Sequence, residues 1–258
     1  MKLHFKQLGQ GEPLVFLHGL FGSSDNWLGI APKLAENFRV ILPDLRNHEA
    51  SPHAAEMDFP LMAGDVAELL EACNLKQPTI IGHSLGGKVA MQLALSRPEL
   101  LKALVVVDIA PQAYAPAHNT IFAALRALDL NSFKLRSEIE AAMMAEIPEL
   151  ATRRFLLKNV GSTPEGRFYW KFNLEGVYQN YPRLNEAVVS TWQTTFDKPT
   201  LFVRGSKSDY ISDMDWPEIQ RHFPAAQLVT LPEAGHWVHA DAPEDFTAAM
   251  QEFLREIR

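Results

Sequence analysis

A single cysteine, Cys73, occurs among the 258 residues of the sequence, and this excludes an internal disulfide. Cys73 falls in an apolar, helical pattern, where a free cysteine normally packs as a small hydrophobic residue instead of reacting. The fold must therefore be stabilised by a hydrophobic core and not by covalent cross-links.

Long apolar runs, basic runs and metal-ligand clusters are missing as well. No run of about 18 apolar residues is present, and the opening residues lack the apolar centre of a signal peptide. We therefore expect a cytoplasmic protein without integral membrane association. The 24 Lys and Arg residues are outnumbered by 31 Asp and Glu residues, giving a formal net charge of −7, so nucleic acid is not an expected partner. No metal-ligand spacing is present, so we expect no metal and no organic cofactor.

Hydrophobic residues, 47% of the chain, fall into short runs that alternate with longer helical patterns. The runs are almost wholly apolar, as is typical of parallel strands covered by helices on both faces. The alternation predicts an α/β fold with a mostly parallel central sheet. The expected strands are Leu14–Leu17, Arg39–Leu42, Thr79–Ile81, Ala103–Val107, Thr200–Val203 and Gln227–Leu231, with an antiparallel edge near Leu3–Leu8. The expected helices of this part are Asn26–Glu36, Leu61–Ala72, Gly86–Ser96, Asp213–His222 and Pro243–Ile257.

The alternation fails between Ile109 and about Phe196. This region contains helical patterns and turn signals, but no convincing buried strand. We predict a helical cap, residues 111–195, inserted in a core domain of residues 1–110 and 196–258. The helices expected in the cap are Thr120–Leu128, Ser132–Ala145, Glu149–Asn159 and Leu184–Thr194.

The pentapeptide Gly82-His83-Ser84-Leu85-Gly86 has the form G-x-S-x-G and lies between an apolar strand and a helix. In this context the motif predicts a nucleophilic serine on a sharp turn. Glycines two residues to either side allow neighbouring backbone to approach without a Cβ clash. We therefore predict Ser84 as the nucleophile and assign no catalytic role to His83.

A nucleophilic serine that attacks an acyl carbonyl needs two backbone N–H donors for the developing oxyanion. One donor is expected to be the amide of Leu85, directly after the nucleophile. The other is expected in the loop that follows the strand ending at Gly19, from Leu20 or alternatively from Phe21.

The general base is expected in the segment PEAGHWVHAD, directly after the last predicted strand. His236 follows the small residues Ala234 and Gly235, and histidine is the residue type whose imidazole suits proton transfer at neutral pH. His239 is the alternative, and we favour His236.

The acidic partner of the base has two candidates, because the chain order of this fold places it between the serine and the histidine. Asp108 ends a strand beside the nucleophile strand, where an unpaired carboxylate would be costly. Asp209 follows a later strand, but it is one residue out of register with the pattern G-x-x-D counted from Gly205, which puts Ser208 in the acid position. We favour Asp108 and keep Asp209 as the alternative.

The motifs together identify a resemblance to the α/β-hydrolase superfamily over the whole chain, and within it to the bacterial YbfF-type acyl esterases and their animal mitochondrial relatives. The segments that carry it are HGLFGSSDNW, PDLRNHEASPH, GHSLGGKVAM, VVDIAP and AGHWVHAD. The resemblance implies Asp108 as the acid. Glu49 departs from the pattern, because relatives usually have glycine there, and relatives tend to lack a carboxylate at Asp209.

The resemblance implies a serine esterase that acts on a small-molecule acyl ester through a Ser–His–Asp triad, with acyl-CoA thioesters as a second substrate class. Basic residues of the cap (Arg153, Arg154, Lys158, Arg167 and Lys171) are candidates for contacts with phosphate groups. A carbon–carbon bond hydrolase or lyase with the same triad is the alternative, because fold alone does not determine chemistry. A non-catalytic small-molecule receptor is a third hypothesis. The sequence leaves the oligomeric state open.

Overall fold

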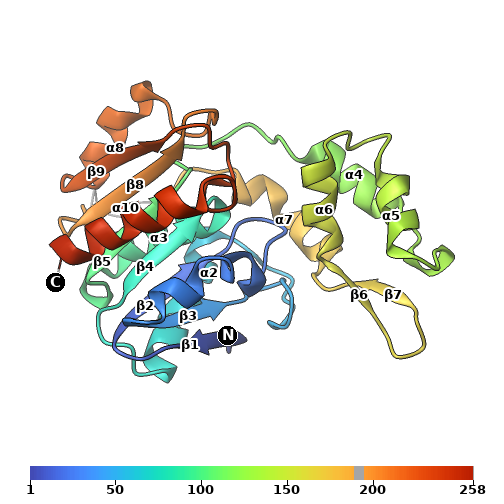
Figure 1. Ribbon diagram of the computed structural model, residues 1–258, viewed down its shortest axis with the longest axis horizontal. Helices are drawn as coiled ribbons and strands as arrows, with labels where there is room; N and C mark the ends of the chain where they lie inside the picture. The colour runs from blue at the N-terminus through green and yellow to red at the C-terminus, as the bar shows by residue number, and fades with distance from the viewer. Residues whose placement is uncertain (189–194, 258) are drawn as a thin grey trace.

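The computed structural model describes residues 1–188 and 195–257 (Figure 1). Within these residues a seven-stranded sheet has the strand order β1-β3-β2-β4-β5-β8-β9. All neighbouring strands are parallel except β1, which pairs antiparallel with β3. The strands are β1 (Phe5–Leu8), β2 (Glu12–Leu17), β3 (Phe38–Pro43), β4 (Thr79–His83), β5 (Ala103–Val107), β8 (Thr200–Gly205) and β9 (Ala226–Leu231). The predicted α/β class and mostly parallel sheet are confirmed.

Two hydrophobic clusters cover the two faces of the sheet. Val15 and Phe16 are neighbours on β2, yet they belong to different clusters, because successive strand side chains point to opposite faces. The cluster around Val15 includes Val89 of the helix that follows Ser84, and the cluster around Phe16 includes Phe246 of the last helix. Burial of each such side chain stabilises the fold by about 1.5–3 kcal/mol, so the sheet is a rigid base for loops at its edge.

The helices outside the inserted region lie near their predicted positions, and two of them are split. They are η1 (Ser24–Trp27), α1 (Ala31–Leu34), α2 (Phe59–Ala72), α3 (Leu85–Ser96), η2 (Pro98–Leu100), η4 (Asp213–Asp215), α8 (Trp216–His222), α9 (Val238–Asp241) and α10 (Pro243–Glu256). The expected helix Asn26–Glu36 is divided into η1 and α1, and Pro32 lies in the first turn of α1. Proline has no N–H group and is best tolerated in that first turn.

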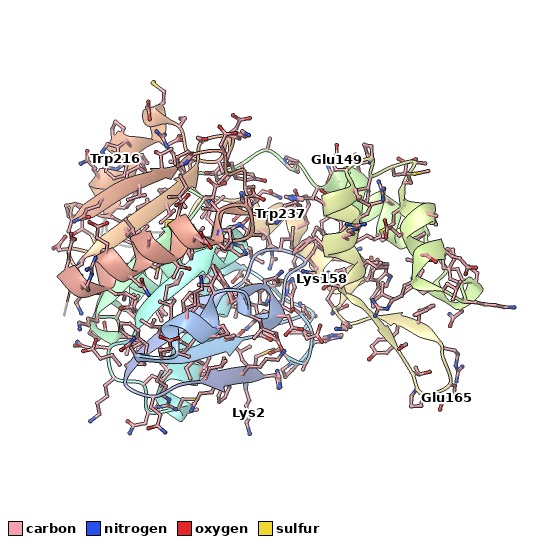
Figure 2. The ribbon with its side chains drawn as sticks, viewed as in Figure 1. Lys2, Glu149, Lys158, Glu165, Trp216 and Trp237 are labelled. Atoms are coloured by element: carbon pink, nitrogen blue, oxygen red, sulfur yellow. The ribbon has the colours of Figure 1, made fainter. Side chains whose placement is uncertain are left out.

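The inserted region lies to one side of the sheet (Figure 1) and contains both helices and a β-hairpin. Its elements are α4 (Asn119–Ala127), η3 (Leu130–Ser132), α5 (Arg136–Met143), α6 (Leu150–Leu157), β6 (Val160–Ser162), β7 (Phe168–Trp170) and α7 (Leu174–Leu184). Figure 2 shows Glu165 at the tip of the hairpin, away from the sheet.

The hairpin and helix α7 were not expected from the sequence. In the hairpin, Gly161 pairs with Tyr169, whose ring occupies the space that a Cβ at Gly161 would need. Such short strands carry little periodic signal. Helix α7 begins with Asn173 as a cap, whose side chain accepts from the Gly176 N–H at 3.0 Å, and it contains Pro182 in its last turn. The expected helix Leu184–Thr194 begins where α7 ends, and its residues 189–194 lie outside the described part of the chain.

Lys88 on α3 connects the nucleophile helix to both ends of the inserted region. Its side chain is buried, with 2% exposed, and its Nζ donates to the carbonyls of Pro111 at 3.0 Å, Glu186 at 3.2 Å and Gln112. The two connecting segments also bond to each other, because the Val188 N–H donates to the Pro111 carbonyl at 2.8 Å. The chain therefore leaves and re-enters the core at one cross-linked neck.

The described helices include none that is both long and apolar enough to span a bilayer. The longest helices, α2 and α10, each have 14 residues. A membrane-spanning helix needs about 20 residues.

Candidate active site

Ser84 lies on the sharp turn between β4 and α3. Its backbone has φ +52°, a left-handed value that costs a non-glycine residue about 1–3 kcal/mol. Gly82 and Gly86 make the turn possible, because a Cβ at Gly82 would overlap the Gly86 carbonyl and a Cβ at Gly86 would overlap the Leu17 carbonyl. The Ser84 N–H is held by the Val107 carbonyl at 3.0 Å. The hydroxyl is thus held at the carboxyl end of the parallel sheet.

His236 lies between Ser84 and Asp108, which come from distant parts of the chain. Its Nε2 is 3.0 Å from Ser84 Oγ, and its Nδ1 is 2.7 Å from Asp108 Oδ2. A carboxylate oxygen accepts, so Nδ1 carries the proton and Nε2 is free to accept the Ser84 hydroxyl proton. This arrangement can transfer a proton from the serine to the imidazole.

Asp108 is fully buried and receives three donors. Besides His236, the Gly205 N–H donates to Oδ1 at 3.0 Å, and the Ser208 hydroxyl donates to Oδ2. Its backbone has φ +53°, so the turn that presents the carboxylate is itself strained. Asp209 is exposed, and within the described residues the hydrogen bond and ion pair of His236 with a carboxylate are those with Asp108. The geometry therefore joins Asp108 to the histidine and leaves Asp209 outside.

Ser208 and Tyr210 are site residues that the sequence analysis did not assign. Ser208 occupies the position where the G-x-x-D pattern would have an acid, and it supports the carboxylate that Asp108 supplies from the neighbouring strand. The Tyr210 ring stacks on the His236 ring, with 4.0 Å between centroids and 23° between planes. The sequence showed that Ser208, and not Asp209, stands in the acid position of the G-x-x-D pattern. The hydrogen bond from Ser208 to Asp108 was seen only in the structure.

His83, next to the serine, forms a hydrogen bond with the backbone of the loop that contains His236. Its Nε2–H donates to the His236 carbonyl at 2.8 Å, and its ring lies 4.8 Å from the His236 ring. His239, the alternative base, is 7% exposed and makes no hydrogen bond to Ser84 within the described residues. His83 therefore packs against His236, and His239 packs against His83 and Trp27.

Burial holds the histidines around the site in the neutral form. Desolvation lowers the pKa of His83 well below 6.5, and the nearby His236 and His239 lower it further. Desolvation also lowers the pKa of His239 to about 3 and that of His18 below its usual value. Because the neighbouring histidines stay neutral, a proton that His236 accepts stays on His236. The carboxylate of Asp108 balances the positive charge that results.

The loop proposed for the oxyanion is held by His18 and lies beside Ser84. His18 Nδ1–H donates to the Gly19 carbonyl at 2.9 Å, and His18 Nε2 accepts from the Leu45 N–H at 3.0 Å. Leu20 lines a cavity together with Ser84 and Leu85. The N–H groups of Leu20 and Leu85 have no acceptor among the described residues, and both are therefore available to a ligand.

Phe21, the alternative donor, has its carbonyl fixed from the inserted region. Asn159 Nδ2 donates to that carbonyl at 2.8 Å, and the Phe21 backbone has φ +57°. Its N–H group is also without an acceptor within the described residues. The choice between Leu20 and Phe21 therefore stays open.

Two cavities meet at Ser84 and differ in size. The larger has a volume of about 440 Å³ and opens between the core and α4 and α6 of the inserted region. Figure 2 shows Trp237 on the side of the core that faces the inserted region, and its ring lies 5.2 Å from that of Phe155 on α6. The smaller cavity, about 50 Å³, extends toward Lys88 and Tyr114. The serine thus faces one roomy, mostly apolar space and one small space.

No group of three or more His, Cys, Asp or Glu residues within the described part of the chain is arranged to hold a metal ion. The groups around Ser84 that can move protons or bind an oxyanion are side chains and backbone amides of the chain itself.

A doubly covered parallel sheet with a serine on the strand-to-helix turn and a histidine in the loop after the last strand defines a serine hydrolase of the α/β type. Comparison with known families agrees, because the model of the alpha/beta hydrolase fold family matches residues 12–243. The chain belongs to this family.

Several relatives are similar along nearly the whole chain. The sn-1-specific diacylglycerol lipase ABHD11 of Danio rerio is 40% identical, over 97% of this chain and 81% of its own. Esterase YbfF of Escherichia coli is 35% identical, over 99% of this chain and 100% of its own. A solved structure described as a marine microorganism esterase is 42% identical with a TM-score of 0.95, covering 98% of this chain and 99% of that chain. These similarities make the chain a hydrolase of the esterase and lipase kind.

Proposed function

We propose that the protein is a serine esterase that hydrolyses carboxylic esters through a covalent acyl-enzyme. The observation that carries this proposal is the continuous line of contacts from Ser84 Oγ to His236 Nε2 at 3.0 Å and from His236 Nδ1 to Asp108 Oδ2 at 2.7 Å. Such a line activates an alcohol that is otherwise a weak nucleophile.

The first half of the reaction forms the acyl-enzyme. His236 accepts the Ser84 hydroxyl proton as Oγ attacks the ester carbonyl, and Asp108 stabilises the imidazolium that results. The N–H groups of Leu85 and of Leu20 or Phe21 bind the oxyanion. Collapse of the tetrahedral intermediate expels the alcohol, which takes the proton from His236.

The second half frees the acid. Water enters beside His236, gives its proton to Nε2 and attacks the acyl carbonyl on Ser84. Collapse of this second intermediate returns the proton to Ser84 Oγ and releases the carboxylic acid. The buried, triply bonded carboxylate of Asp108 holds the imidazole in one orientation throughout both halves.

The sizes and linings of the two cavities support the proposal that the substrates are uncharged esters with one bulky apolar group. A cavity of about 440 Å³ lies within the range of small-molecule sites, and its lining is mainly apolar and aromatic. Because the animal relatives are named diacylglycerol lipases, a diacylglycerol is one substrate to test. Because the bacterial relative is named an esterase, short esters are another.

Acyl-CoA thioesters are less well supported by the basic residues of the inserted region. Arg153 is buried and donates to the carbonyls of Ile147 at 2.8 Å and Pro148 at 2.7 Å. Lys171 pairs with Glu49 at 3.1 Å. Two of the five candidate phosphate contacts are therefore already bonded to the protein itself.

A substrate panel combined with an active-site label tests the proposal. The purified protein should react with a fluorophosphonate probe at Ser84. The substrate panel contains p-nitrophenyl esters, a diacylglycerol and an acyl-CoA, and at least the simple p-nitrophenyl esters should be hydrolysed at a measurable rate. Labelling without ester turnover, but with cleavage of a diketone, would instead favour carbon–carbon bond hydrolysis. Absence of both labelling and turnover would indicate a binding protein.

A further inference from the structure

His118 lies at the junction of the two cavities. It precedes α4 in the outgoing neck of the inserted region, and it is one of the described residues that line both cavities, with Leu20, Ser84 and Tyr210. Ser84 also lines both cavities, so a carbonyl carbon beside its Oγ would have space for a substituent on either side. His118 therefore lines the space that the atoms next to the scissile bond would occupy.

A hydrogen bond to Tyr181 fixes which nitrogen of His118 carries the proton. The Tyr181 hydroxyl oxygen accepts from the His118 main-chain N–H at 2.9 Å. The hydroxyl proton then needs an acceptor, and the described residues offer His118 Nδ1, also at 2.9 Å. Nδ1 therefore accepts, and the single proton of the neutral ring is on Nε2.

Burial keeps the His118 ring neutral at ordinary pH. Desolvation, with a smaller contribution from the nearby His236, lowers the pKa of His118 to about 4. The ring thus has one N–H donor and no positive charge.

The Nε2–H group of His118 has no acceptor among the described residues. Its aromatic neighbour Phe21 lies with 6.0 Å between ring centroids. Nδ1 is bonded to Tyr181, so Nε2–H is the ring donor available to a ligand in the cavities that His118 lines. Lys88, the one lysine or arginine among the described residues that line them, already donates from its Nζ to three carbonyls. An uncharged acceptor therefore suits this place better than a carboxylate.

We propose that His118 Nε2–H is a substrate-recognition donor, which selects esters that carry an uncharged ether or hydroxyl oxygen within two carbons of the scissile ester group. The inference rests on the proposed esterase function and names the substrate feature that the same site recognises. Tyr181 is a positioning residue, because it acts through the tautomer of His118.

Pairs of esters with equal numbers of heavy atoms test the proposal. The alcohol side is tested by 2-hydroxyethyl butanoate against propyl butanoate, and the acyl side by ethyl methoxyacetate against ethyl butanoate. Wild-type kcat/KM should favour the oxygen-bearing member of at least one pair by about fivefold, the size of one neutral hydrogen bond. The intrinsic reactivity difference within each pair is removed by dividing by the rates of hydroxide-catalysed hydrolysis.

His118→Phe should reduce the corrected preference to about one, because the ring remains and the donor is lost. Tyr181→Phe should reduce it partially, because the tautomer is no longer fixed. Ile121→Val, on the next turn of α4 in the same cavity, is the matched control and should retain the wild-type preference. A purely structural defect would lower both members of a pair equally and leave their ratio unchanged.

A corrected wild-type preference below twofold in both pairs, with all four esters hydrolysed, would overturn the role of His118 and leave the esterase function intact. Hydrolysis of none of the four esters would overturn both. If His118→Phe does not fold by circular dichroism, His118→Leu, which also lacks a donor, replaces it, and the wild-type ratios decide the matter independently. A preference retained in the folded variant would also overturn the assignment.

Discussion

At the scale of single residues, the carboxylate of Asp108 shows how a buried charge is tolerated. It is fully buried, and its two oxygens receive donors from Gly205, Ser208 and His236. An unpaired carboxylate at this depth would be strongly destabilising. We infer that the three donors hold the carboxylate beside the imidazole, whereas the exposed Asp209 lacks such donors.

Replacing each candidate acid by asparagine distinguishes between Asp108 and Asp209 as the acidic partner of His236. Asp108→Asn should lower kcat by about 10⁴, because the amide no longer holds the productive tautomer of His236. Asp209→Asn should change kcat by less than about threefold, as expected for an exposed side chain away from the histidine. Steady-state kinetics on a p-nitrophenyl ester would measure both, and a reversal of the two results would show that the acid had been wrongly assigned.

The sequence predicted residues that the fold brings together at the candidate site, but not all of their neighbours. The G-x-S-x-G context placed Ser84 on a turn between a strand and a helix, and strand order brought Asp108 beside it, as the pairing of β4 with β5 shows. The stacking of Tyr210 on His236 and the bond between Tyr181 and His118 join segments far apart in the chain. Local periodicity carries no information about such contacts.

At the scale of elements, strands were easier to predict than the inserted region. The strands β2, β3, β4, β5 and β8 of the large sheet have buried, apolar runs flanked by turn residues, so their pattern is strong. The hairpin of β6 and β7 has three residues per strand, and α7 contains Pro182, which argues locally against a helix. The contacts between these elements and the core override the weak local signals.

The neck of the inserted region offers an element-scale prediction. Lys88→Met should lower the free energy of unfolding by about 1–3 kcal/mol, because the carbonyls of Pro111, Gln112 and Glu186 lose a buried donor. Urea unfolding followed by fluorescence would measure the loss.

Lys102→Met is the matched control for Lys88→Met. Lys102 is partly exposed and pairs with the exposed Glu12 at 3.3 Å, so its replacement should cost less than about 1 kcal/mol. Equal losses in the two variants would contradict a special role of Lys88 at the neck.

At the scale of the whole molecule, the structure buries several neutral histidines close to one another. Desolvation lowers the pKa of His48 to about 3 and that of His239 to about 3, and it also lowers the pKa values of His18, His83 and His118. A histidine whose folded pKa lies below its unfolded value near 6.5 takes up its proton on unfolding. The free energy of unfolding therefore falls as the pH drops below about 6.5 and continues to fall toward pH 3.

The variant His48→Asn tests this acid sensitivity. Asparagine can still donate to the Arg46 carbonyl, which His48 Nδ1 meets at 2.9 Å, but it cannot take up a proton. Between pH 7 and pH 5 the free energy of unfolding of the variant should fall by about 2 kcal/mol less than that of the wild type. Urea unfolding at both pH values would measure the difference, and identical pH dependence would show that His48 is not held neutral.

The proposed chemistry depends on residues brought together by the overall fold, because Ser84, Asp108 and His236 follow three separate strands. The central claim is that these residues create one activated alcohol. Its most direct test is mass spectrometry of the acid-quenched enzyme during turnover of a p-nitrophenyl ester. The account predicts an acyl adduct on the peptide that contains Ser84, lost in His236→Gln. An adduct on another residue, or undiminished turnover by Ser84→Ala without an adduct, would contradict it.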